Sequence, residues 1–105
     1  GVYDLPAYTA LVQAAYGIAG DGSDYDTQTA GYDPILRDGA DFRGVPVRLY
    51  TSAGDTVQPP AGSEAFADLL TPYAPESVVV YGTGAHLDPS QYQAADVVAF
   101  FTRYL

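Results

Sequence analysis

Two residues of this 105-residue chain carry side chains suited to proton transfer at a shared site: Asp55 and His86, the only histidine present. Imidazole suits general acid–base catalysis because it titrates near neutrality. A carboxylate beside it fixes the tautomer of the ring and stabilises the imidazolium form. An aspartate followed 31 residues later by a histidine is therefore a candidate acid–base pair.

Each of these two residues follows a stretch with the pattern of a β-strand. Apolar residues alternate over 45–51, and the stretch ends in Ser-Ala-Gly-Asp at Asp55. Residues 77–81 are nearly all β-branched, as in a strand covered on both faces, and a Gly-Thr-Gly-Ala turn leads from them to His86. Since functional groups of open α/β sheets gather at the carboxyl ends of the strands, we expect the pair to meet there.

Three helices are expected around these strands. The first begins at Asp4 and Pro6 and stops at Gly17, with Leu5, Tyr8, Leu11, Val12 and Ala15 on one face. The second follows Pro59 and Pro60, with an apolar face of Ala65, Phe66, Leu69, Leu70 and Tyr73. The third starts at Asp88-Pro89-Ser90-Gln91 and is expected to bury Tyr92, Ala95, Val98, Ala99, Phe101 and Leu105. Residues 19–43 read as loop, with one short helix near 34–38. We therefore divide the chain into 1–43, a helix plus a long loop, and 44–105, strand–helix–strand–helix.

The second of these segments resembles the C-terminal part of an α/β-hydrolase. Gly44-Val45-Pro46-Val47 into Gly54-Asp55-Thr56-Val57 resembles the strand and turn that carry the acid of that family. Val78–Tyr81 into Gly84-Ala85-His86-Leu87-Asp88 resembles the strand and loop of its histidine, and 97–101 its closing helix. The resemblance implies an α/β fold in which these are the last two parallel strands. It also implies Asp55 and His86 as members of the catalytic triad, and Thr56 and Val57 lining the substrate cleft. In that family, residues 1–43 would lie on the cleft side or in a cap.

The chain departs from that family in its missing nucleophile. None of its five serines, Ser23, Ser52, Ser63, Ser77 and Ser90, lies in a G-x-S-x-G. Two strands also make no stable sheet alone. With no methionine in the chain, we expect a processed or partial polypeptide in a hetero-oligomer, completed by an N-terminal chain or segment that carries G-x-S-x-G. The function implied is that of a serine hydrolase without a cofactor, an esterase or peptidase-like enzyme acting on a small ester or peptide-like substrate.

An alternative of another class is a non-catalytic structural or adhesion module of a larger assembly. Its Ala-, Asp- and Tyr-rich, lysine-free composition resembles hydrolase-like segments of bacteriophage tail proteins. This resemblance favours a secreted or virion-associated location, which the sequence otherwise leaves open. A small flavodoxin-like domain is disfavoured by the strand count.

Composition excludes several partners. Four Arg against 13 acidic residues give a net charge of −9, which repels the phosphates of nucleic acids. No apolar run approaches the roughly 20 residues of a membrane span, and no cysteine is present for disulfides or thiolate metal sites. The acidic stretch from Asp21 fails the calcium-loop template, since its sixth and twelfth positions are Asp26 and Tyr32. We therefore expect no metal site.

Overall fold

The structure is a computed structural model that describes residues 8–105 and divides into two compact units, one ending at Asp38 and the other spanning Gly39–Leu105. The helix start predicted at Asp4, Leu5 and Pro6 lies outside the described residues. No helix among residues 8–105 is long and apolar enough to cross a membrane.

Residues 8–38, the described part of the first unit, contain two short helices and one 3₁₀ turn. Helix α1 spans Thr9–Tyr16 and ends, as predicted, at Gly17, whose φ of 66° is the left-handed conformation that glycine adopts readily. Helix α2, Tyr25–Thr29, lies in a stretch that we predicted to be loop; its five residues carry no apolar periodicity. The turn Pro34–Leu36 is capped by Asp33, and the Tyr25 hydroxyl donates to Asp33 over 2.5 Å.

Most of the face predicted for the first helix is exposed. Among the described members of that face, Tyr8, Leu11 and Ala15 are exposed, and α1 contains no buried residue. Among residues 8–38, the buried apolar residue is Ile18, just beyond the helix.

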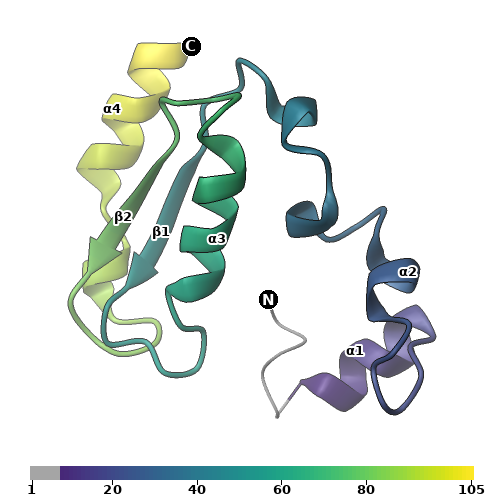
Figure 1. Ribbon diagram of the computed structural model, residues 1–105. Helices are drawn as coiled ribbons and strands as arrows, with labels where there is room; N and C mark the ends of the chain where they lie inside the picture. Colours follow the sequence, from purple (N-terminus) through teal and green to yellow (C-terminus); the bar gives the residue numbers. More distant parts are fainter. Residues whose placement is uncertain (1–7) are drawn as a thin grey trace. The chain divides into compact units, whose positions relative to one another are not determined.

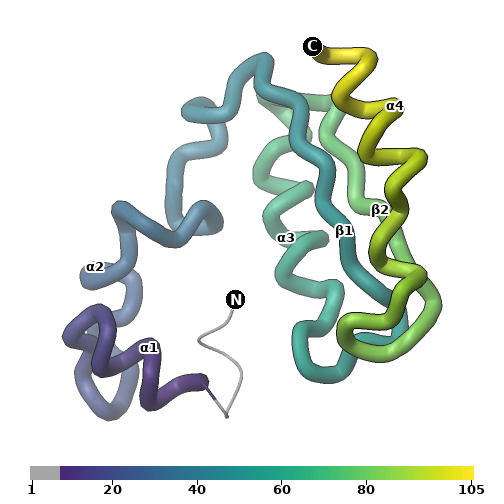
Figure 2. Tube along the Cα trace, turned by 180° about the vertical axis from the view of Figure 1, so that it is seen from behind, coloured from purple at the N-terminus to yellow at the C-terminus, as the bar shows by residue number. Residues whose placement is uncertain are grey.

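The second unit is a two-stranded parallel sheet with a helix on each side (Figure 1). Strand β1 spans Arg48–Ser52 and strand β2 spans Val78–Gly82, with Arg48 opposite Val78 and Ser52 opposite Gly82. Helix α3, Ala61–Leu70, connects the two strands, and helix α4, Ala94–Tyr104, follows a 3₁₀ turn at Pro89–Gln91. Figure 2 shows the same path from behind, with β1 and β2 again side by side. The α/β class and the order strand–helix–strand–helix predicted for this segment are confirmed.

Both strands begin slightly later than predicted. The strand expected over 45–51 begins at Arg48, because Pro46 has no N–H and Val45 is exposed. Pairing starts where Val47 N donates to Ser77 Oγ over 3.0 Å and Val78 N donates to Val47 O over 3.0 Å. Val78 and Tyr81 are exposed, so β2 is not covered on both faces as we predicted.

The core of this unit lies under α3. Leu70 and Ala74 are fully buried, and the rings of Phe42 and Phe66 meet edge to face at 5.3 Å. A 3₁₀ turn at Gly39–Phe42 packs on α3 so closely that a Cβ on Gly39 would lie 2.6 Å from the Leu69 carbonyl oxygen. The predicted inner face of the helix is confirmed except at Ala65, which is exposed.

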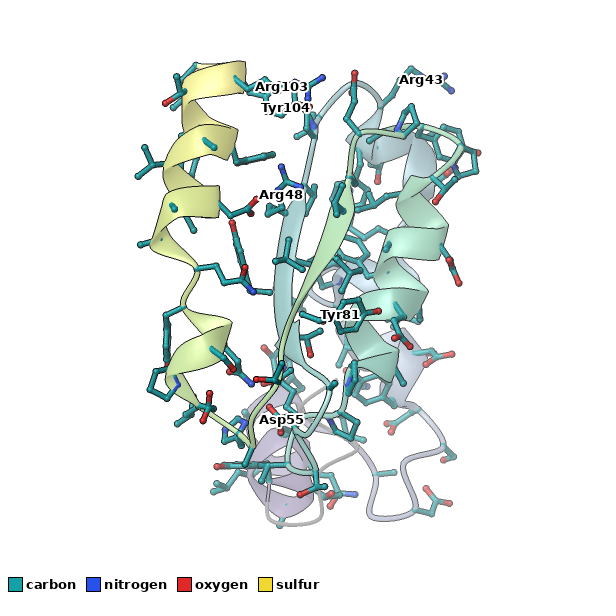
Figure 3. The ribbon with its side chains drawn as sticks, turned by 90° about the vertical axis from the view of Figure 1, so that its left-hand side faces the viewer. Arg43, Arg48, Asp55, Tyr81, Arg103 and Tyr104 are labelled. Atoms are coloured by element: carbon teal, nitrogen blue, oxygen red, sulfur yellow. The ribbon has the colours of Figure 1, made fainter. Side chains whose placement is uncertain are left out.

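The buried stripe predicted for the last helix is wrong. All six of its members are exposed: Tyr92, Ala95, Val98, Ala99, Phe101 and Leu105. Asp96 sets the orientation of α4, because it accepts a 2.8 Å hydrogen bond from the Tyr50 hydroxyl and lies 3.5 Å from Arg48 Nε. Arg48 reaches from β1 toward α4 and stacks over the Phe100 ring (Figure 3). The half-buried apolar side chains are accordingly Val97, Phe100 and Tyr104.

The burial of Leu70 leads to a stability prediction. Replacing it with alanine removes apolar contacts and leaves a cavity, so we expect Leu70→Ala to lower the free energy of unfolding by about 2–5 kcal/mol in chemical denaturation. The control Val45→Ala, at an exposed position before β1, should change it by less than about 0.5 kcal/mol. Equal effects of the two substitutions would contradict this account of the core.

Candidate active site

Asp55 and His86 lie in contact just past the carboxyl ends of β1 and β2. The Oδ2 atom of Asp55 is 2.8 Å from Nδ1 of His86. The Asp55 side chain is almost completely buried, at 4% exposure, whereas that of His86 is 31% exposed. Figure 3 labels Asp55 at this end of the sheet. The structure therefore brings together the two residues that the sequence singled out, and it leaves the imidazole accessible from solvent.

The carboxylate of Asp55 is fully occupied by hydrogen-bond donors. Its Oδ1 accepts from the backbone N–H of Val57 over 3.0 Å and from that of Gln58 over 2.7 Å. Its Oδ2 is shared between His86 and the side-chain amide of Gln91, whose Nε2 lies 3.2 Å away. A carboxylate offers about four lone-pair positions, so no acceptor position is left over.

These donors lower the pKa of Asp55. Burial acts in the opposite direction and is the largest single effect, but the hydrogen bonds from Gln58, His86, Gln91 and Val57 together outweigh it. The pKa falls from 3.8 to about 2. The carboxylate is therefore ionised at neutral pH and can only accept, so Nδ1 of His86 must carry a proton. In the neutral imidazole, Nε2 is then the atom that can accept a proton from a substrate.

The two loops that carry the pair pack tightly against each other. The hydroxyl of Ser52 donates to the carbonyl oxygen of Gly84, and a Cβ on Gly54 would lie 2.7 Å from that same oxygen. Ser90 Oγ accepts from Thr83 N over 2.9 Å and from Gly84 N over 3.3 Å. The acid turn and the histidine loop thus behave as one packed piece.

Backbone strain occurs directly beside the histidine. Leu87 has a φ of 60°, the left-handed conformation, and it is the only non-glycine residue among those described with a positive φ. For a bulky residue such a conformation costs on the order of 1–2 kcal/mol. Its side chain is 62% exposed, so packing of the side chain does not compensate that strain.

The remaining predictions for this site concern Asp88, Thr56 and Val57. Asp88 caps the 3₁₀ turn by accepting from Ser90 N over 2.8 Å, as predicted, but the α-helix begins only at Ala94. Thr56 and Val57 are exposed next to Asp55, and their substrate contacts remain a prediction. Sequence reasoning missed Gln91 as a donor to Asp55. No spacing in the sequence predicts this contact, because it depends on how the turn at Pro89–Gln91 folds back toward Asp55.

No metal centre accompanies the pair within residues 8–105. No group of three or more His, Asp or Glu side chains there converges in a way that could hold a metal ion. Two acidic side chains of the first unit instead accept hydrogen bonds from the backbone. Asp24 Oδ1 accepts from Ala19 N over 2.8 Å, and Asp21 Oδ1 accepts from Ser23 N over 3.0 Å.

Comparison of the chain with protein-family models, with curated proteins and with solved structures found no match to any of them.

The close approach of the two loops predicts that Gly54 tolerates no side chain. In Gly54→Ala the new Cβ would meet the Gly84 backbone, which cannot rotate away, so we expect a loss of about 1–3 kcal/mol in the free energy of unfolding. Gly20→Ala is the matched control, because a Cβ there meets nothing within 4 Å, and it should stay within about 0.5 kcal/mol of wild type. A neutral effect at Gly54 would show that the loops are further apart than described.

The pKa of Asp55 predicts how stability depends on pH. Unfolding returns this group from about 2 to 3.8, so the unfolded chain binds the proton first as the pH falls. Its stabilising contribution is present above about pH 4 and is lost as the pH falls through about 2. The ¹³C NMR titration of its carboxyl group should have a midpoint near pH 2.

Asp55→Asn should therefore flatten the decline in unfolding free energy over the same interval, compared with wild type and with the surface control Asp68→Asn. A carboxyl titration with a midpoint near pH 4 would contradict the hydrogen-bond arrangement described for Asp55.

Proposed function

We propose that this chain supplies the acid and the base of a serine hydrolase of the α/β-hydrolase type, in which another polypeptide segment provides the nucleophile. The observation that carries the proposal is the 2.8 Å contact between Asp55 Oδ2 and His86 Nδ1 at the carboxyl ends of adjacent parallel strands. That contact directs Nε2 of a partly exposed imidazole outward, as a base requires.

The reaction would be acyl transfer to water. His86 Nε2 takes the proton of a serine hydroxyl as the oxygen attacks the carbonyl carbon, and the imidazolium returns that proton to the leaving group. Asp55 holds the ring by Nδ1 and stabilises its charged form without itself taking the proton. An ester or a peptide-like bond would serve as substrate, and two exposed apolar residues, Val57 and Leu87, follow Asp55 and His86 closely in the sequence.

Three of the five serines of this chain, Ser52, Ser77 and Ser90, make other contacts. Ser52 is fully buried and donates to Gly84 O, Ser77 Oγ accepts from Val47 N at the other end of the sheet, and Ser90 Oγ accepts from two backbone N–H groups. Within residues 8–105 no serine is recorded in a hydrogen bond with His86. This supports a nucleophile that comes from another segment.

The second unit also carries surfaces that a further segment could cover. Within residues 39–105, β1 pairs with a strand along one edge only. Val47 and Ala53 bond toward β2, so by alternation the backbone groups of Arg48 and Tyr50 face the other edge. Val98, Phe101 and Leu105 form an exposed apolar stripe along α4. A strand along β1, accompanied by a helix over that stripe, would complete the sheet and bury both.

A serine-reactive fluorophosphonate probe tests the proposal. We expect it to label a serine in a G-x-S-x-G of a segment that copurifies with this chain, identified by native and denaturing mass spectrometry. Without its base the serine is hardly nucleophilic, so His86→Ala should slow labelling by about 10⁴-fold or more. The control Thr102→Ala, at an exposed position on α4, should leave the rate unchanged.

Absence of any labelled serine in the assembled protein would contradict the catalytic proposal. If, in addition, binding to a cell surface survived His86→Ala, the chain would be a structural or adhesion module of a larger assembly.

A further inference from the structure

Gln91 is the one donor on Asp55 that neither the strand-end turn nor the histidine explains. It lies in the 3₁₀ turn Pro89–Gln91, 36 residues from Asp55 in sequence, and its Nε2 is 3.2 Å from Asp55 Oδ2. The residue is only partly buried, so desolvation of its amide does not by itself require this partner. An ionised carboxylate has no donor, so the NH₂ group of the amide must be the part that faces it.

The contact of Gln91 with Asp55 matters because of the carboxylate oxygen that it involves. The two backbone donors bind Oδ1, so neither of them contacts the oxygen that bonds to His86. Gln91 binds Oδ2, the oxygen that faces Nδ1 of His86. It is therefore the one other donor on the oxygen to which His86 must stay bonded.

The backbone of Gln91 is itself held in place. Its N–H donates to Asp88 O over 2.9 Å, and Tyr92 N donates to Pro89 O over 3.0 Å, which closes the turn on both sides of the residue. The hydroxyl of the preceding Ser90 accepts from Thr83 N and Gly84 N. The same turn thus holds the histidine loop through Ser90 and the acid through Gln91.

We propose that Gln91 is a positioning residue of the site: its amide holds Asp55 Oδ2 against Nδ1 of His86 and so keeps Nε2 of that ring as the free base. The role in catalysis rests on the proposed function. The geometric part, the orientation of Asp55 and the tautomer of His86, is independent of any activity.

NMR of the assembled protein with this chain labelled by ¹⁵N-histidine tests the geometric part. His86 is the only histidine of the chain, so its two ring nitrogens give an unambiguous signal pair. In wild type the neutral ring should be protonated almost entirely at Nδ1. In Gln91→Ala the two tautomers should mix. In Gln91→Glu, which is nearly isosteric, a second carboxylate meets Oδ2, so the titration midpoint of Asp55 should rise by at least about one pH unit.

Gln93→Ala is the matched control, since the amide of Gln93 donates to Tyr81 O over 3.1 Å and is recorded in no bond to either member of the pair. In Gln93→Ala, the tautomer of His86 and the titration midpoint of Asp55 should equal those of wild type. If the Gln91 variants also behave like this control, the proposal is wrong. Should the alanine variant fail to fold, the glutamate variant decides by the same two signals.

Fluorophosphonate labelling separates this proposal from the proposed function. Gln91→Ala should slow labelling about tenfold, the factor expected for one lost hydrogen bond to a charged group, and Gln93→Ala should not. Altered NMR signals in a protein that is never labelled would overturn the proposed function and leave the positioning role intact. Normal labelling and unaltered signals in Gln91→Ala would overturn the positioning role alone.

Discussion

The second unit is built around the burial of one ionised carboxylate. Asp55 is almost completely enclosed, and an enclosed charge is tolerated only when hydrogen bonds replace the water that it has lost. Four donors do so, and they come from three places: the start of the α3 connection, the histidine loop and the turn before α4. The charge thereby connects three segments of the second unit through hydrogen bonds. These hydrogen bonds are therefore needed for the packing of the surrounding segments as well as for any proton transfer at the site.

How far the sequence predicts this structure depends on how local the determining forces are. The parallel strands and the meeting of Asp55 with His86 follow from alternation, β-branching and the rule that strand ends converge. The orientation of α4 does not, because the helix is apolar on two sides and a tertiary contact at Asp96 selects between them. Helix α2 was missed because five residues hold no readable period. Gln91 was read as part of a helix start, since nothing local shows where its amide points.

The second unit exposes several large apolar side chains, although few of its apolar residues are fully buried. Leu70 and Ala74 are its fully buried apolar residues, while Val98, Phe101 and Leu105 on α4 face outward. One edge of β1 has no partner strand within residues 39–105. Exposed apolar stripes and open strand edges typically mark surfaces of association, and here both occur on the same small unit. The contacts that position the pair thus all lie within the unit, which also carries the open strand edge and the exposed apolar stripe.

The contact between Gly54 and Gly84 also constrains how this site can change over time. Where a large side chain meets a small one, a substitution at one position can be offset by a smaller residue at the other. Here the atoms facing position 54 belong to the backbone of a residue that already lacks a side chain. No second substitution at position 84 can make room for a side chain at position 54. Sequence variation in these loops is therefore expected at residues such as Leu87, whose side chain is exposed. The backbone contact between the two loops therefore leaves few routes for compensated mutation.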